Sequence, residues 1–174
     1  MKRKINLIKF VALLICLACF AFTASAQKRK KTVRRSTTST AAMTTEIKAN
    51  AQKVSTQIKN VSKFIYVLGG VARTIEDIDK EAAAGKVSRA GLDQNAQFKQ
   101  SVITSIRNLR AGLIALEIEF RTKPALKNYL INIQGISDIS GTAEDQAVNG
   151  QFTQSGKTLL LIVEKLSDTL AAMP

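Results

Sequence analysis

Residues 47–68 read IKANAQKVSTQIKNVSKFIYVL, and this stretch decides the fold of the protein. Its apolar side chains recur at alternating intervals of four and three residues, which is an unbroken heptad pattern. The members of this heptad seam are Ile47, Ala51, Val54, Ile58, Val61, Ile65 and Leu68. Such spacing places all of them on one face of an α-helix, so the stretch predicts a long amphipathic helix. At Gly69-Gly70 we expect a kink or a close helix contact, and near Gly85 the end of the helix.

Helical spacing continues along the rest of the chain. A second helix is expected to begin between Ser88 and Asp93 and to end near Arg121. Its inward-facing side chains are Phe98, Val102, Ile106, Leu109, Leu113, Leu116 and Phe120. A third, shorter helix is expected to begin near Pro124, because proline is tolerated in a first turn, and to end at Ser140-Gly141.

A fourth helix is expected to open at Thr142, with Asp145 three residues later as a loose capping box. Its apolar positions are Ala147, Phe152, Leu159, Ile162, Val163, Leu166 and Leu170. No alternating strand pattern competes with these helices, and short connections favour antiparallel neighbours. Residues 44–174 are therefore predicted to form an all-α domain, an antiparallel up-down bundle of four helices with a short third helix.

The first 26 residues have the three parts of a secretory signal peptide. Basic residues come first, an apolar run follows from Phe10 to Phe22, and Ala24-Ser25-Ala26 forms a small-residue cleavage site. The apolar run is shorter than the ~20 residues that span a bilayer, which disfavours an uncleaved membrane anchor. Lipidation at Cys19 is also disfavoured, because the apolar run continues beyond it. We therefore expect export to a periplasm or secretion, with residues 1–26 cleaved.

Residues 27–43 read QKRKKTVRRSTTSTAAM and contain no acidic residue. Their six basic side chains are Lys28, Arg29, Lys30, Lys31, Arg34 and Arg35. This segment has too few apolar side chains to offset the entropy of ordering, so it is predicted to be a disordered tail. From residue 27 onward the net charge is +9, and the tail carries six of those nine charges.

The predicted first helix continues this basic character. Lys48, Lys59 and Lys63 fall on one helical stripe, and Lys53 lies nearby. With the tail, these lysines form a candidate binding site for an anionic surface. The alternative is a solvated helix exterior joined to a charged spacer.

The composition excludes several chemistries. The chain has no histidine and no tryptophan, and both of its cysteines, Cys16 and Cys19, lie in the signal peptide. Disulfides, thiolate or imidazole zinc sites, histidine-ligated haem and Ser-His or Cys-His catalytic pairs are therefore excluded from the remaining chain. We expect a protein that is not an enzyme and that needs no cofactor or metal.

Three short patterns have ordinary structural interpretations. Residues 150–158 read GQFTQSGKT, but five residues instead of four separate the glycines of a phosphate loop and no strand precedes them. The acidic cluster of residues 76–81 is interpreted as a solvated face, with Glu76 paired to Lys80. Glu117 and Arg121 are interpreted as a surface ion pair.

The leading hypothesis is an exported, non-enzymatic helical-bundle binding protein that attaches to an anionic envelope component, either lipid headgroups or polysaccharide. One alternative is a protein-interaction or self-association module that uses the heptad seam. Another is an apolar-ligand carrier or sensor, with a pocket where the short third helix leaves the bundle thin. Specific nucleic-acid binding is not expected, because Phe64 and Tyr66 are the only aromatic residues near the basic stripe.

Overall fold

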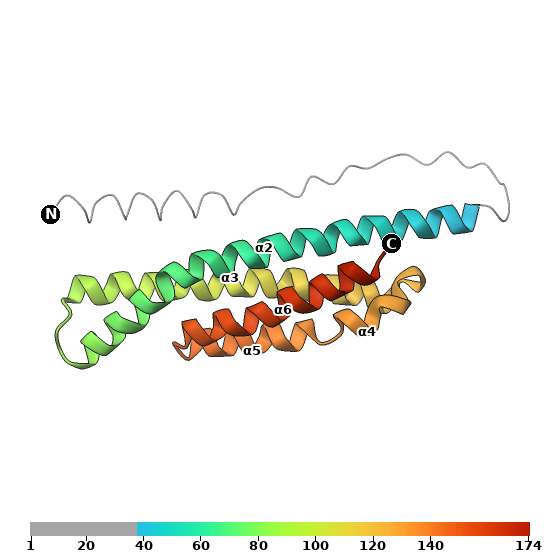
Figure 1. Cartoon of the computed structure of the whole chain (residues 1–174). Helices are drawn as coiled ribbons and strands as arrows, with labels where there is room; N and C mark the ends of the chain where they lie inside the picture. Colours follow the sequence, from blue (N-terminus) through green and yellow to red (C-terminus); the bar gives the residue numbers. More distant parts are fainter. Residues whose placement is uncertain (1–37) are drawn as a thin grey trace. The chain divides into compact units, whose positions relative to one another are not determined.

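The computed structural model describes residues 38–174, and within this range the chain is helical and contains no strand (Figure 1). The elements are α2 (Thr38–Ala83), α3 (Arg89–Thr122), the 3-10 helix η2 (Pro124–Tyr129), α4 (Leu130–Ile133), α5 (Ile136–Val148) and α6 (Phe152–Ala172). The predicted all-α class is confirmed for this part of the chain. The predicted signal peptide and the six basic residues of the tail lie outside the described residues.

The long helices contact one another in a closed order. Helix α2 packs against α3 and α6, and α5 packs against the same two helices from the opposite side. The elements η2 and α4 connect α3 to α5; η2 contacts α3 and α2, and α4 contacts α3 and α6. Figure 1 shows the four long elements running side by side, with α2 and α3 extending beyond the turn that joins α5 to α6. Each of the four long elements α2, α3, α5 and α6 therefore packs against two of the others, and short pieces connect α3 to α5.

The core is built from side chains that recur at intervals of seven residues. In α2 these are Val54, Val61, Leu68 and Ile75, and in α3 they are Ile106, Leu113 and Phe120. Helix α6 repeats the interval with Phe152, Leu159 and Leu166. All ten side chains are between 0 and 2% exposed. Because a seven-residue interval returns to nearly the same helix face, each row lies on one face of its helix, and the rows meet in one core cluster.

The heptad seam predicted in residues 47–68 faces this core. Val54, Val61 and Leu68 are buried, and the other seam members are half-buried against the core cluster. The amphipathic-helix prediction for this stretch is therefore confirmed. Helices α3 and α6 of the same chain pack against α2, and its seam residues Val54, Val61 and Leu68 are covered within the chain.

Helix α2 is longer than expected at its N-terminal end and continuous at its centre. It begins at Thr38, so residues 38–43, which were assigned to the disordered tail, are helical. It also runs through Gly69-Gly70 without interruption, and a Cβ atom at either glycine would have nothing within 4 Å. The expected close helix contact at the glycine pair is therefore absent, although α2 bends visibly in its green section in Figure 1.

The predicted boundary between the third and fourth helices was wrong. Helix α5 continues through Ser140 and Gly141, and Thr142 lies inside it with its hydroxyl donating to the Asp138 carbonyl. The chain breaks instead at Gly135, with φ of 87°, and again at Gly150, with φ of 78°. These left-handed conformations favour glycine, because a Cβ atom would clash with the backbone. The described residues therefore contain five α-helices and one 3-10 helix instead of four helices.

Within residues 38–174, no helix combines the length and the apolar character needed to cross a lipid bilayer.

Candidate binding surface on α2 and α6

Three of the predicted binding lysines lie together on an exposed stripe of α2. Lys48, Lys59 and Lys63 are exposed, and none of them forms an ion pair with another residue of the described range. Eleven and four residues separate them, and both intervals return close to the same helix face. We call these three residues the basic stripe.

Lys53 does not belong to this stripe. Its ammonium group binds both carboxylate oxygens of Glu119 on α3, and Lys123 binds the same carboxylate. Burial raises the pKa of Glu119, but the hydrogen bonds and charges of Lys123 and Lys53 outweigh this effect and lower its pKa. Lys53 is therefore a link between α2 and α3, and its charge is largely neutralised.

Helix α2 has a long stretch without acidic residues around the basic stripe. No acidic residue occurs between Glu46 and Glu76 in the sequence. Tyr66, which is 86% exposed, follows Lys59 by seven residues, and Arg73 follows Tyr66 by seven more. These intervals place the tyrosine and the arginine on the same outer face as the basic stripe. Between residues 47 and 75 this face therefore presents cations and an aromatic ring without an acidic side chain of its own helix, and the exposed Asp77, one turn after Arg73, pairs with Lys80.

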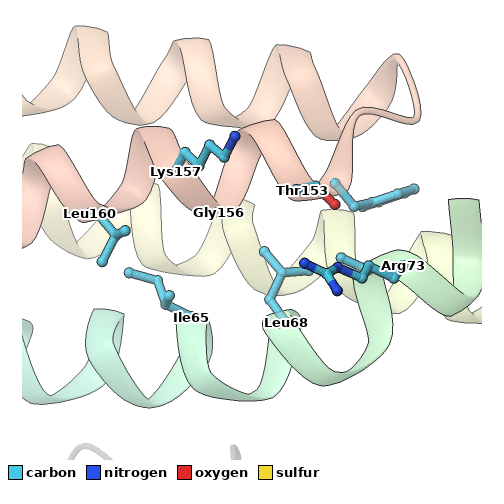
Figure 2. A pocket seen from close by; sticks show the side chains of 10 residues that line it. Ile65, Leu68, Arg73, Thr153, Gly156, Lys157 and Leu160 are labelled. Atoms are coloured by element: carbon cyan, nitrogen blue, oxygen red, sulfur yellow. The ribbon is translucent and has the colours of Figure 1, made fainter.

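An open groove of about 270 Å³ lies beside this face, between α2 and α6. Its apolar lining includes Ile65, Leu68 and Ala72 from α2 and Phe152, Gly156 and Leu160 from α6 (Figure 2). Arg73 and Lys157 also line it, and both are exposed. The hypothesis of an apolar-ligand site placed a pocket at the short third helix, whereas the groove lies on the other side of α6.

The segment GQFTQSGKT contributes to this groove, but it does not form a phosphate loop. Glu76 of α2 accepts hydrogen bonds from the Thr153 backbone N–H at 2.8 Å and from the Thr153 hydroxyl at 3.0 Å. The first turn of α6 thus already holds a carboxylate of the protein in the place where a helix N-terminus would bind a phosphate. The Thr153 N–H and hydroxyl therefore donate to a side chain of the protein itself.

The expected pairing of Glu76 with Lys80 was wrong, because the Glu76 carboxylate binds Thr153. Lys80 binds Asp77 instead, at 3.1 Å, and both side chains are largely exposed. Asp79 binds Lys99 and accepts a hydrogen bond from Asn95 on α3. Among the described residues, no group of three or more potential metal ligands comes together. Within the acidic cluster, Glu76 and Asp79 therefore make contacts between helices.

Glu117 is buried, which sequence reasoning missed. Its carboxylate accepts hydrogen bonds from the Gly135 N–H, the Ser137 N–H and the Ser137 hydroxyl, and it also binds Arg121. The residue is 1% exposed, so the predicted surface pair with Arg121 is only one part of a buried network. The i,i+4 spacing identified Arg121, but the other partners lie in a turn that the sequence did not reveal.

The comparisons with known proteins add no assignment, because no protein-family model matches the chain and no curated protein or solved structure is significantly similar to it.

Proposed function

We propose that this protein is an exported, non-enzymatic binding protein that attaches to an anionic envelope component through its basic tail and the outer face of α2. In this proposal residues 1–26 are a signal peptide, the tail of residues 27–43 supplies a first set of charges, and the helical domain is an up-down bundle. The protein acts in the periplasm or outside the cell.

The observation that carries this proposal is the charge distribution along α2. Lys48, Lys59 and Lys63 are exposed on one face, have no ion-pair partner in residues 38–174 and lie in a stretch without acidic residues. A basic residue near an anionic membrane contributes about 1 kcal/mol, so removing all three would weaken binding by roughly 100-fold at low salt. Lys53 contributes less, because Glu119 already neutralises it.

Tyr66 favours a lipid surface over a linear polysaccharide as the anionic component. It is exposed on the same face, and an aromatic ring with a polar tip suits the boundary between water and acyl chains. Leu160 and Leu161 of α6, 47% and 48% exposed, add apolar area to the exterior of α6.

Sedimentation with lipid vesicles tests the proposal. The chain from residue 27 is mixed with vesicles of phosphatidylcholine alone, or of phosphatidylcholine with phosphatidylglycerol, over a series of salt concentrations. We expect binding to the anionic vesicles only, weakening steeply as salt rises, because exposed charges are screened within ~8 Å at physiological ionic strength. A chain that begins at Thr44 separates the contribution of the tail.

The matched control removes the same number of charges elsewhere. Lys48→Gln, Lys59→Gln and Lys63→Gln are combined in one variant, and Lys86→Gln, Arg89→Gln and Lys127→Gln in another. The second set is also exposed and also lacks ion pairs in the described part of the chain. Equal losses from the two variants would mean that net charge alone matters and would overturn the role of the basic stripe. The chain from residue 27 is also tested on an immobilised anionic polysaccharide. If it binds neither this polysaccharide nor the anionic vesicles, the whole proposal is overturned.

A further inference from the structure

The groove between α2 and α6 has an apolar floor and a cationic rim. Leu68, Ala72 and Phe152 form the floor and are at most 3% exposed. Arg73 and Lys157 stand at the rim, and neither forms an ion pair with any residue of the described range. Two uncompensated cations beside an apolar surface select a ligand that is both apolar and negatively charged.

The two ends of the groove differ in character, because one end is apolar and the other is polar. Figure 2 shows Ile65 and Leu160 approaching each other at one end, whereas Arg73 and Thr153 lie toward the other end. The nearby Glu76 carboxylate is bound by Thr153 and makes no ion pair with Arg73. The positive charge of Arg73 therefore remains available at the polar end.

Two glycines within helices line this groove. Gly69 lines the groove in the middle of α2, and a Cβ atom there would have nothing within 4 Å. Gly156 lines it from α6, where a Cβ atom would lie 3.4 Å from Leu68 Cδ2. Neither glycine has the positive φ that would require it for conformational reasons. Gly156 therefore makes room for the buried Leu68 side chain of α2, whereas the absence of a side chain at Gly69 leaves space at the groove.

We propose that this groove binds a single alkyl chain that carries an anionic head group, such as a medium-chain fatty acid. The head group pairs with Arg73 at the polar end, Lys157 adds a second positive charge from α6, and the chain lies along the floor toward Ile65 and Leu160. The volume of about 270 Å³ is slightly below the ~300–1,000 Å³ of typical small-molecule pockets, which suits one slender chain better than a two-chain lipid.

This inference does not rest on the basic stripe, although Arg73 and Leu160 belong to both proposed surfaces. The basic stripe of Lys48, Lys59 and Lys63 does not line the groove. A variant that lacks the basic stripe should therefore bind the monomeric amphiphile as the unmodified chain does. Each proposal can fail without the other.

Calorimetric titration of the chain from residue 27 tests the inference. Decanoate, hexanoate and decyltrimethylammonium are each used below the concentration at which they form micelles. We expect saturable binding of decanoate, about tenfold tighter than hexanoate, because each additional methylene group buried in a half-open groove adds roughly a factor of two. Decyltrimethylammonium has the same chain length and the opposite charge, and it should bind at least about tenfold more weakly than decanoate.

Two neighbouring leucines provide a matched pair of variants. Leu160 lines the groove and is 47% exposed, whereas Leu161 is 48% exposed and does not line it. Because both are so exposed, a glutamate is tolerated at either position without loss of the fold. Leu160→Glu should weaken decanoate binding by more than about tenfold, and Leu161→Glu by less than about threefold. A variant that combines Arg73→Gln with Lys157→Gln should lose the preference for decanoate over decyltrimethylammonium.

Three outcomes would overturn the inference. Saturable decanoate binding is required, so its absence ends the proposal. Equal effects of the two leucine variants would place the ligand elsewhere on the molecule. Equal affinity for decanoate and decyltrimethylammonium would show that Arg73 and Lys157 do not select the charge of the head group.

Discussion

The carboxylate of Glu117 in α3 accepts a 2.9 Å hydrogen bond from the backbone N–H of Gly135, eighteen residues later in the chain. Gly135 is the residue at which the chain turns between α4 and α5, with φ of 87°. The same carboxylate also accepts from the N–H of Ser137 in the first turn of α5. A buried side chain of one helix therefore holds both the break in the chain and the start of the next helix.

Replacing Glu117 by glutamine should destabilise the fold markedly. The amide keeps one acceptor oxygen but places an NH₂ group against the N–H of Gly135 or Ser137, which leaves buried donors without a partner. We expect a loss of about 2–4 kcal/mol in the free energy of unfolding, measured by urea denaturation at neutral pH. The mutation Ser137→Ala removes only the hydroxyl contact and should cost about 1 kcal/mol. A loss below ~0.5 kcal/mol for Glu117→Gln would contradict the network.

Stability should depend on pH through the same residue. Burial raises the pKa of Glu117, but hydrogen bonds from Ser137, Gly135 and Arg121 outweigh this effect and lower the pKa from 4.5 to about 2. As pH falls the unfolded chain takes up the proton first, so the stabilisation is complete above pH ~5 and is lost as pH approaches 2. The lowered pKa of Glu117 corresponds to a stabilisation of the folded state of about 3 kcal/mol at neutral pH. The difference in unfolding free energy between the unmodified chain and Glu117→Gln should therefore shrink across this range, and a constant difference would exclude the linkage.

Alanine should have opposite effects at two glycines. At Gly135 the positive φ strains any residue with a Cβ atom, so Gly135→Ala should lower the unfolding free energy by about 1–2 kcal/mol. At Gly70, inside α2, a Cβ atom meets nothing within 4 Å, and Gly70→Ala should raise the unfolding free energy by about 0.5–1 kcal/mol. Urea denaturation curves of the two variants and of the unmodified chain measure both changes in unfolding free energy. The same sign at both positions would disprove the backbone explanation.

Glu76 should stabilise α6 from a neighbouring helix. The residue before α6, Gln151, forms no side-chain capping bond, and the carboxylate of Glu76 supplies that contact through Thr153. Glu76→Ala should therefore cost about 1–2 kcal/mol, as the loss of a helix cap does. Asp77→Ala is the control, because its exposed pair with Lys80 contributes little, below ~0.5 kcal/mol. Thermal unfolding of the two variants distinguishes these expectations, and similar melting temperatures would contradict them.

Removal of residues before Thr44 should leave the folded domain intact. Residues 40–45 are helical but exposed, so their removal exposes little additional apolar area. We expect a change below ~0.5 kcal/mol in the free energy of unfolding and a small loss of helical circular dichroism. A larger loss of stability would show that the beginning of α2 is part of the folding unit, and the vesicle experiment would then need substitutions in the tail instead of its deletion.

The elements predicted most accurately are those with long, regular apolar spacing. The heptad seam of residues 47–68 is buried or half-buried as expected. The second predicted helix corresponds to α3, whose N-cap Ser88 accepts a hydrogen bond from the Gly91 N–H. Apolar periodicity is a local property of the chain, and long helices repeat it often enough to be recognised.

The glycines show where local information was insufficient. Gly141 was expected to end a helix, but it lies inside α5, where a Cβ atom would come within 3.3 Å of the Arg110 guanidinium. Gly135, which was not singled out, is the actual break. A glycine can provide a positive φ or room for a neighbouring side chain, and the sequence alone does not distinguish the two uses.

The sequence by itself determined that residues 44–174 form helices, which faces of α2 and α3 are apolar, and that the positive charge is concentrated toward the N-terminal end of the chain. The tertiary structure decided where the third helix breaks, that Glu76 and Glu117 bind backbone N–H groups far along the chain, and that Lys53 is paired whereas Lys59 has no partner in the described residues. It also created the groove between α2 and α6. The physical reason is range: helical periodicity acts over a few residues, whereas a carboxylate, a cation or a glycine acquires its role from whichever element packs against it.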